Sequence, residues 1–495
     1  MFTALDWFVL VFYILLSVAI GLWASRGSKD FRGYMLGGGS MPWVAVGISL
    51  IATSVSATTF LGNPAESYAH DMSFLMNNFG ALIAIIVVGF LFIPKIKSAG
   101  ITSAYELFEK HFSPAVRRLA AAFYSLHLLL RMGILLFAPS LVLAPILGVD
   151  IHIAILITAA VATVYTWYGG FKAVVWTDVL QFCVLFGGGV VTLFVIAHGV
   201  GGFGNLMHLA SASGKTAWFN ASDWNPANAR NLLSAGIIYA VIEIAIRGCD
   251  QQFVQRYLSC KSAREANLSS VLSMVLGIFV SILFFWVGAG LFVYYNVQGA
   301  GALPPGTPEN GVFPQFIVSV LPPGVTGLVV AAIYAAAMSS LSSAINALGN
   351  TTVKDILLVR NESAGTLAKA KRWTLLWAVL STGCAFIAVD MKDSLLANAL
   401  FFTGLFTGPL LALFLLAFFT KRIPARAVIP AVLCGMFSIV LFNKVPVIPS
   451  YTPPFAGVVS FFWNPLISCT VTLLCANLFR LFTRGKTLLR NELPL

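Results

Sequence analysis

The stretch GISLIATSVSATTF at residues 47–60 decides how the rest of this chain is organised. It begins apolar and then carries five hydroxyl side chains in seven residues. These are Thr53, Ser54, Ser56, Thr58 and Thr59. The apolar sequence on both sides is long enough for a membrane helix, and hydroxyls at this density indicate an interrupted helix whose oxygens line a cavity for a cation or a polar solute. The alternative is that Ser and Thr bond carbonyls one turn earlier or join neighbouring helices.

The composition is that of a polytopic membrane protein. Of 495 residues, 59% are hydrophobic and only 10% are charged, compared with roughly 25% charged residues in a soluble domain. The seven cysteines have irregular spacing and fall mostly in apolar runs, so we expect neither a disulfide framework nor a zinc site. The N-terminus carries Asp6 and no basic segment ahead of the first apolar run, so this run is expected to be a retained span and not a cleaved signal.

Apolar runs predict an all-α protein with about thirteen transmembrane helices. The runs are 7–24, 43–62, 74–94, 119–147, 151–168, 174–198, 231–249, 268–294, 324–349, 373–390, 395–419, 427–443 and 455–479. An odd number of spans places the two termini on opposite sides of the membrane. Between them, the segment ITSAYELFEKHF (101–112) is amphipathic and is expected to lie along the membrane surface.

Lys and Arg are unevenly divided between the predicted loops. Alternate loops, beginning with the one after the first helix, contain 24 of the 30 basic residues, Arg256 among them, and the loops between them contain four. The remaining two, Arg131 and Arg247, lie within spans. Because loops rich in Lys and Arg stay in the cytoplasm, we expect the N-terminus outside and the C-terminus in the cytoplasm. The net charge of +12 therefore reflects topology and not nucleic-acid binding.

Arg131 is predicted to lie near the middle of the bilayer, because about 20 Å of helix separates it from Arg117 and Arg118. A charge at this depth costs at least about 2.5–3.5 kcal/mol, so it should face a cavity and have a partner. No acidic residue lies within one turn of it. The partner is therefore either a carboxylate on a distant helix or an anionic substrate, which a guanidinium can hold by two parallel hydrogen bonds.

Arg247 differs, since Glu243 and Asp250 lie at i−4 and i+3 and can neutralise it locally. We interpret this trio as mainly structural, with Asp250 as the one candidate site residue.

A second group of hydroxyls lies in AAIYAAAMSSLSSAIN (331–346). Its four serines, together with carbonyls near Ala52 and Val55 and the carboxylate of Asp178, form the kind of oxygen set that a hard cation such as Na⁺ prefers. Small residues also permit close helix packing, which is the simpler interpretation of this segment. Alone, Asp178 would be interpreted as an interfacial cap or as the partner of Lys172.

Five stretches together resemble the sodium:solute symporter family across nearly the whole chain. They are IATSVSATTF, ITSAYELFEKHF, VYTWYGGFKAVVWTDVLQ, DQQFVQRYLS and AAIYAAAMSSLSSAIN. The resemblance implies a LeuT-like fold built from two inverted five-helix repeats. On this basis a single transmembrane domain comprises an extra N-terminal helix (7–24), a first repeat (43–198), a second inverted repeat (231–419), two C-terminal helices (427–479) and a cytoplasmic tail (480–495).

The resemblance also implies two sodium sites and a substrate site. The positions that correspond to the first sodium site are Ala52, Val55, Ala336, Ser339 and Ser340. The second sodium site corresponds to Asp178, Ser342 and Ser343, with Ser339 as a candidate shared ligand. The chain looks most like the bacterial sialic acid transporters of the family, which have an arginine for the substrate carboxylate where Arg131 stands. Their other substrate contacts correspond to Ser54, Ser56, Thr59, Phe74 and Asn78, although Ser54 replaces a threonine and Asn78 replaces a glutamine.

We therefore expect a secondary active symporter that imports a small anionic solute, sialic acid, by alternating access with about two Na⁺ per substrate. It is expected to work as a monomer in a bacterial inner membrane. A monocarboxylate or a vitamin such as pantothenate is the alternative substrate, because RMGILLFAPSLVL (131–143) also resembles that branch of the family. A transporter-like sensor or a channel is the alternative class. Enzymatic activity is not expected, since paired carboxylates, HExxH and a Ser–His–Asp arrangement are not found in the sequence.

Overall fold

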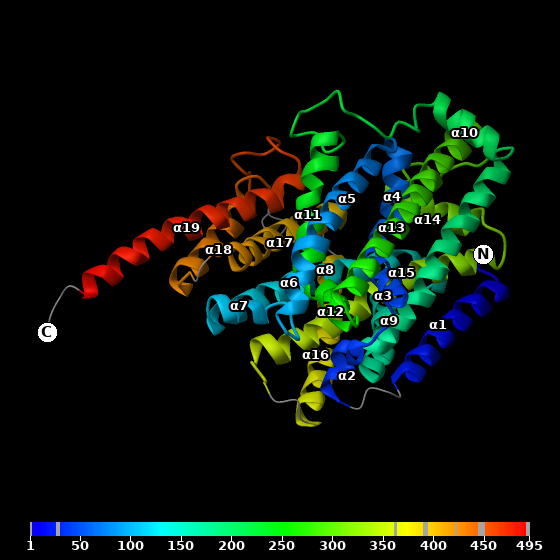
Figure 1. Ribbon diagram of the computed structural model, residues 1–495. Helices are drawn as coiled ribbons and strands as arrows, with labels where there is room; N and C mark the ends of the chain where they lie inside the picture. Colours follow the sequence, from blue (N-terminus) through cyan, green and yellow to red (C-terminus); the bar gives the residue numbers. More distant parts are fainter. Residues whose placement is uncertain are drawn as a thin grey trace.

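The computed structural model describes residues 2–25, 30–360, 364–389, 395–420, 423–443 and 451–491. Within these ranges the chain is a bundle of helices with no strand (Figure 1), which confirms the predicted all-α class. The helices are α1 Ala4–Ser25, α2 Phe31–Leu36, α3 Trp43–Ser54, α4 Ala57–Ala69, α5 Asn77–Val87, α6 Ile93–Ser98, α7 Glu106–His111, α8 Pro114–Leu147, α9 Ile151–Gly199, α10 Phe203–Ala212, α11 Tyr239–Cys249, α12 Gln251–Ser259, α13 Ala263–Phe292, α14 Glu309–Ser319, α15 Val325–Thr351, α16 Ala364–Val389, α17 Leu395–Phe419, α18 Ala425–Val440 and α19 Asn464–Asn491.

The predicted number of thirteen spans is not confirmed. In the described part of the chain, nine helices are long and apolar enough to cross a membrane, or ten if one bent pair counts as a single span. Part of the difference is an interruption, because the predicted span 43–62 is divided into α3 and α4. Two further predicted spans, 395–419 and 427–443, correspond to the shorter apolar helices Thr403–Phe419 and Ala425–Val440. Conversely, the two predicted spans 151–168 and 174–198 are joined in α9, whose 49 residues would measure about 74 Å if straight. The last residue of the span 373–390 lies outside the described residues.

Gly170 interrupts α9, with φ 57° and ψ −152°. This conformation is almost restricted to glycine. An added Cβ would also lie 2.5 Å from the carbonyl oxygen of Tyr34 on α2. The bend that separates the two parts of α9 therefore depends on this one residue.

Gly170→Ala should lower the free energy of unfolding by about 1–3 kcal/mol, the usual cost of forcing a side chain into such a conformation. The measurement is the thermal unfolding midpoint of the purified protein in detergent. Gly187→Ala is the matched control, because it lies on the same helix and its Cβ would meet nothing within 4 Å. Equal midpoints for the two variants would contradict this account.

α15 is the central helix of the bundle. In its most apolar window 94% of the residues are buried, whereas the figure for α1 is 22%. Figure 1 shows α1 and α19 at opposite edges of the molecule, while α15 packs against α1, α3, α8, α9 and α16. Alanine, serine and glycine side chains along α15 allow these helices to approach closely. The serines of α15 therefore face other helices and not lipid.

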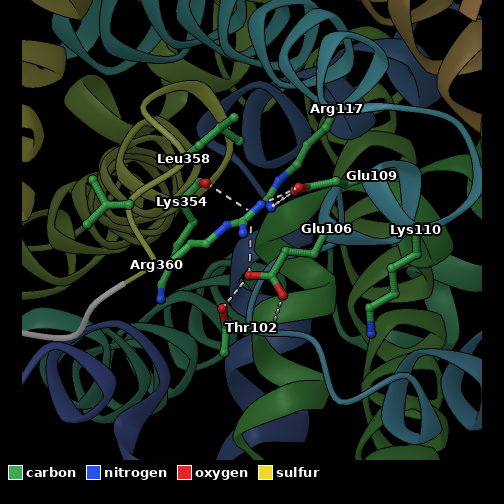
Figure 2. A pocket seen from close by; sticks show the side chains of 9 residues that line it. Thr102, Glu106, Glu109, Lys110, Arg117, Lys354, Leu358 and Arg360 are labelled. Carbon is green, nitrogen blue, oxygen red and sulfur yellow. Dashed lines mark hydrogen bonds and ion pairs between the residues drawn. The ribbon is translucent and has the colours of Figure 1, made fainter.

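A cluster of ion pairs joins α7 and α8 to the segment that follows α15 (Figure 2). The Arg117 guanidinium lies 2.8 Å from Asp355 and 2.6 Å from Glu109, which also pairs with Arg360 at 2.8 Å. The hydrogen bond from Arg117 lowers the pKa of Glu109. The cluster borders a cavity of about 440 Å³. The predicted amphipathic segment is thus tied to the bundle by charge as well as by its apolar face.

The final helix is longer than the sequence predicted. α19 continues through Asn491, so most of the segment expected as a tail (480–495) extends the last helix. Residues 492–495 of that segment lie outside the described residues.

Candidate functional site

The helix break predicted in the hydroxyl-rich stretch is confirmed. α3 ends at Ser54, and both Val55 (φ −84°, ψ 105°) and Ser56 (φ −99°, ψ 171°) are extended before α4 begins. The Ser56 side chain caps α4 by accepting a hydrogen bond from the backbone N–H of Thr59. The break leaves carbonyls near the end of α3 without helical partners, so they can bind a ligand.

The alternative interpretation of the hydroxyls is also partly correct. Thr53 Oγ1 donates to the carbonyl of Ser49 at 2.8 Å, and Ser54 Oγ donates to the carbonyl of Leu50 at 3.0 Å. These are the one-turn contacts that Ser and Thr commonly make in membrane helices. The side chain of Thr58 lies outside those that the structure describes. The stretch thus combines ordinary helix contacts before the break with a side-chain cap at it.

A second helix break, which the sequence analysis did not predict, lies at Asp250. α11 ends at Cys249, Asp250 is extended (φ −73°, ψ 128°), and α12 begins at Gln251. The Asp250 carboxylate accepts hydrogen bonds from the N–H of Gln252 at 2.7 Å and from the hydroxyl of Tyr124 at 2.9 Å. The signal for this break was an Asp at an N-cap position followed by a polar, glutamine-rich turn.

Arg247 has one of its two expected partners. Its Nε lies 2.6 Å from Glu243, and its Nη1 donates to Ser273 at 3.1 Å. The expected pairing with Asp250 is wrong, because that carboxylate is used as the cap of α12. The local neutralisation of Arg247 within its own helix is confirmed through Glu243.

A cavity of about 240 Å³ lies between the two breaks. Five of the six residues predicted to bind substrate line it. They are Ser54, Ser56, Thr59, Phe74 and Arg131. The sixth, Asn78, lines an adjacent cavity of about 230 Å³ and donates to the carbonyl of Leu75 at 2.9 Å, while its neighbour Asn77 lines both cavities. Successive helical residues point about 100° apart, so only one of the two asparagines can point fully into the main cavity.

Arg131 brings a positive charge to this cavity from the middle of α8. It makes no hydrogen bond or ion pair within the described part of the chain, although Asp250 and Tyr239 lie close enough to interact with its charge. Of the two partners that the sequence allowed, the distant carboxylate is therefore not in direct contact. The guanidinium is available to an anion in the cavity.

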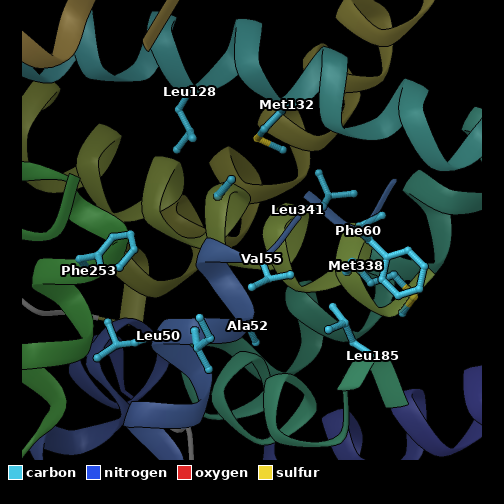
Figure 3. Close-up of a cluster of buried hydrophobic side chains, with 14 of the residues drawn as sticks. Leu50, Ala52, Val55, Phe60, Leu128, Met132, Leu185, Phe253, Met338 and Leu341 are labelled. Atoms are coloured by element: carbon cyan, nitrogen blue, oxygen red, sulfur yellow. The ribbon is translucent and has the colours of Figure 1, made fainter. Parts of the chain in front are cut away.

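The residues predicted for the first sodium site lie together at the break. Ser339 Oγ on α15 donates to the carbonyl of Ala52 at 2.8 Å and to that of Ala336 at 3.1 Å. Ser340 Oγ is buried and has no hydrogen-bond partner among the described residues. Figure 3 shows Ala52 and Val55 at the end of α3, within the apolar cluster that surrounds this point. A buried hydroxyl without a hydrogen-bond partner, next in the chain to a serine that contacts the end of α3, fits a bound cation.

The second predicted sodium site is partly assembled and contains an unpredicted residue, Arg256. Asp178 Oδ2 accepts from Ser49 Oγ and lies 2.9 Å from Arg256 Nη2. Ser343 Oγ lies 3.1 Å from Thr53 Oγ1 and accepts from Arg256 Nη2 at 2.6 Å.

Within the described residues Ser342 makes no hydrogen bond with Asp178 or Arg256; its hydroxyl donates a hydrogen bond to the carbonyl of Ser339 at 3.1 Å. The prediction that Arg256 is a loop residue is wrong, because it lies on α12 with a buried side chain.

Residues 34–435 match the sequence model of the sodium:solute symporter family (SSF). This chain belongs to that family. It is 30% identical over 449 residues to the sodium/sialic acid symporter SiaT of Proteus mirabilis, covering 88% of this chain and 89% of the relative. It is 32% identical over 444 residues to the sodium-coupled monocarboxylate transporter 1 of Xenopus laevis, covering 88% and 71% of the two chains.

A solved structure of a Na⁺-coupled sialic acid symporter, in a substrate-bound, outward-open state and described as having a novel Na⁺ site, has the same arrangement of helices. The TM-score is 0.86 at 28% identity, and the match covers 97% of this chain and 98% of the other. The predicted LeuT-like fold is therefore confirmed. As a member of this family, the protein is a multi-pass membrane transporter that uses Na⁺ as its coupling ion.

Proposed function

We propose that this protein imports a small carboxylate-bearing solute, sialic acid, together with Na⁺. The observation that carries this proposal is the position of Arg131. It lines a cavity of polar and apolar side chains between two broken helices, and it has no ion-pair partner in the described residues. A charge in the membrane interior needs compensation, and the substrate carboxylate supplies it. Helix breaks at the level of the substrate are typical of transporters that work by alternating access.

Two observations support sialic acid over other carboxylates. The relative SiaT and the solved symporter, which match the chain over most of their length, both transport sialic acid by their descriptions. The cavity is also lined by several hydroxyl and amide groups, among them Ser54, Thr59 and Asn63, which suit a polyhydroxylated solute.

A monocarboxylate is the second candidate substrate. The monocarboxylate transporter of Xenopus laevis has about the same sequence identity to this chain as SiaT, 32% against 30%. A monocarboxylate would need only the arginine and a smaller apolar pocket.

The decisive experiment is a ligand panel on the purified protein. Thermal stabilisation by sialic acid, lactate and pantothenate should be measured in NaCl and in an equal concentration of KCl. Sialic acid should stabilise the protein at the lowest concentration, and only with Na⁺, because a ligand raises the unfolding midpoint in proportion to its affinity for the folded state. Stabilisation by lactate alone would favour the second candidate, and equal stabilisation in KCl would argue against sodium coupling.

We infer two sodium sites. Ala52, Val55, Ala336, Ser339 and Ser340 are proposed as ligands of the first, and Asp178, Ser342 and Ser343 as ligands of the second. The buried unpartnered hydroxyl of Ser340 supports the first site. The proximity of the Asp178 carboxylate to the Ser343 hydroxyl, through their shared contact with Arg256, supports the second.

Asp178→Asn should leave residual transport but weaken the second sodium site, since Asp178 supplies the only formal negative charge in the proposed ligand set. The Hill coefficient of uptake against Na⁺ concentration should fall toward one. Glu309→Gln is a control, because this acidic residue is the first residue of α14 and lies outside the proposed sites. An unchanged coefficient above one for Asp178→Asn would show that the carboxylate has a structural role only.

The proposed orientation has the N-terminus outside and the C-terminus in the cytoplasm of a bacterial inner membrane, from the uneven division of Lys and Arg between loops. Two inverted five-helix repeats, residues 43–198 and 231–419, are proposed to move against each other. The breaks at Val55 and Asp250 fall in the first helix of each repeat, which supports this division.

A further inference from the structure

The Asp178 carboxylate is neutralised by an arginine from another helix. Arg256 lies on α12 and is 1% exposed, and its Nη2 is 2.9 Å from Asp178 Oδ2 on α9. A buried pair of this kind is stable only when hydrogen bonds satisfy the remaining polar atoms. The question is therefore which other groups the guanidinium uses.

The guanidinium uses the oxygens that the proposed second sodium site requires. Nη2 also donates to Ser343 Oγ at 2.6 Å, and Nε donates to Ser49 Oγ at 2.8 Å, whose own proton goes to Asp178 Oδ2. The other carboxylate oxygen, Oδ1, is buried and has no hydrogen bond among the described residues. Arg256 thus binds one oxygen of a carboxylate whose other oxygen has no hydrogen bond among the described residues.

One carboxylate cannot balance two adjacent positive charges in a buried site. A sodium ion bound to Asp178 and Ser343 would lie within a few ångströms of the guanidinium, where repulsion between like charges is strong because water is excluded. Both cations would also compete for the same lone pairs on Ser343 Oγ. Full occupancy by Na⁺ therefore requires Arg256 to move away.

Arg256 belongs to a short element that a helix break sets apart. α12 has only nine residues, and the break at Asp250 separates it from α11. Within α12 the guanidinium is anchored by Nη1, which donates to the carbonyl of Gln252 at 2.9 Å. Displacement of the side chain would therefore remove the direct polar link that connects α12 to Asp178.

We propose that Arg256 is an internal competitor of the second sodium ion. The guanidinium and Na⁺ occupy Asp178 and Ser343 alternately, and the arrival of Na⁺ releases α12 from α9. Sodium binding is in this way converted into movement of one half of a broken helix. This inference rests on the proposed second sodium site and assigns a coupling role to a residue outside its ligand set.

Arg256→Gln tests the competition, because glutamine can donate a hydrogen bond but carries no charge. Sodium affinity should be measured without substrate, from the Na⁺-dependent rise in unfolding midpoint at constant ionic strength in NaCl and KCl mixtures. In Arg256→Gln we expect the apparent affinity for Na⁺ to rise about three- to tenfold. Arg256→Lys should give a smaller rise, since lysine keeps the positive charge but lacks the planar guanidinium that donates several hydrogen bonds. An unchanged or weaker affinity in folded Arg256→Gln would overturn the proposal.

Arg117→Gln is the matched control. It removes another buried arginine that is paired with an aspartate, Asp355 at 2.8 Å, in the cluster of Figure 2 away from the proposed sites. The variant should lower the unfolding midpoint without changing sodium affinity. A similar gain in affinity in Arg117→Gln would mean that loosening the bundle, and not relief of competition, produces the effect.

Asp178→Asn separates failure of this inference from failure of the sodium site itself. If Asp178→Asn leaves the sodium dependence unchanged, the second site is wrongly assigned. If it weakens Na⁺ binding while Arg256→Gln does not strengthen it, only the competition is wrong. In the Asp178→Asn background, Arg256→Gln should add no further gain, because the shared carboxylate is gone.

The wild-type protein provides a test that does not depend on the folding of a variant. Cys260 follows α12 directly, is buried, and its Sγ lies 3.7 Å from the carbonyl of Arg256. If Na⁺ releases α12, the rate at which a thiol reagent modifies Cys260, followed by mass spectrometry of its peptide, should be higher in NaCl than in KCl. Equal rates would overturn the proposed release.

Discussion

Arg131→Ala should weaken substrate binding by about 2–4 kcal/mol, roughly 30- to 700-fold, while the protein still folds and inserts into the membrane. The guanidinium lines the cavity, and in the described part of the chain it has no hydrogen bond or ion pair that the substitution would break. Removing an intramembrane charge makes insertion easier. The loss should therefore appear in the dissociation constant, measured by calorimetry in NaCl, and not in the unfolding midpoint without ligand.

Arg131→Lys is the graded control for charge. Lysine keeps the positive charge but offers a single ammonium in place of a planar fork, so it cannot form two parallel hydrogen bonds with a carboxylate. Its affinity should fall between those of the wild type and Arg131→Ala. Equal affinity for the wild type and the lysine variant would mean that only the net charge of the cavity matters.

A substrate analogue completes the argument. Sialic acid with its carboxylate reduced to an alcohol should bind the wild type poorly, and Arg131→Ala should discriminate little between this analogue and the acid. The two changes remove opposite partners of one interaction, so their effects should not add. If the wild type binds the acid and the alcohol equally well, Arg131 is not the carboxylate partner, and the assignment of an anionic substrate loses its main support.

The transported charge follows from the same pairing. Two Na⁺ with one carboxylate carry a net charge of +1 inward, so the membrane potential would contribute about 2.3 kcal/mol per 100 mV to accumulation. Uptake into proteoliposomes should therefore increase when the lumen is made negative.

Features that depend on local chemistry could be predicted from the sequence. The hydroxyl-rich stretch at residues 47–60 predicted a broken helix because Ser and Thr are poorly explained by lipid contact, and the break was found at Val55. The serines of α15 were predicted to bind a cation because they are oxygen ligands among small residues; they are buried in the bundle, and cation binding stays a prediction. In both cases the residue types themselves indicated what the environment must contain.

Features that depend on contacts between distant segments could not. Arg256 was interpreted as a loop charge because positively charged residues after a span usually stay in the cytoplasm. Its partners Asp178, Ser49 and Ser343 come from three other helices, 78, 207 and 87 residues away in sequence. A similar limit explains Asn77, since the side chain that faces the cavity depends on the rotation of α5 and not on the order of the asparagines.

Ser340→Ala should abolish Na⁺-driven uptake at limiting sodium. The Ser340 hydroxyl is buried and has no hydrogen-bond partner among the described residues. The hydroxyl of the preceding residue, Ser339, already donates to two carbonyls. A buried polar group without a partner is costly, so its presence is best explained by a ligand that it binds. Loss of one oxygen from a buried cation should cost about 1.5–3 kcal/mol, roughly ten- to hundredfold in sodium affinity, by analogy with hydrogen bonds to charged groups.

Ser381→Ala is the matched control for this substitution. Ser381 is also a buried serine in a membrane helix, but its hydroxyl donates to the carbonyl of Trp377 at 2.6 Å and lies on α16, away from the break in α3. The measurement is initial uptake of labelled substrate by proteoliposomes over a range of Na⁺ concentrations. Ser340→Ala should shift the half-saturating concentration upward while Ser381→Ala leaves it unchanged. If both variants take up substrate like the wild type at low Na⁺, the unpartnered hydroxyl of Ser340 is not a sodium ligand, and the first site must be built from the backbone carbonyls and Ser339 alone.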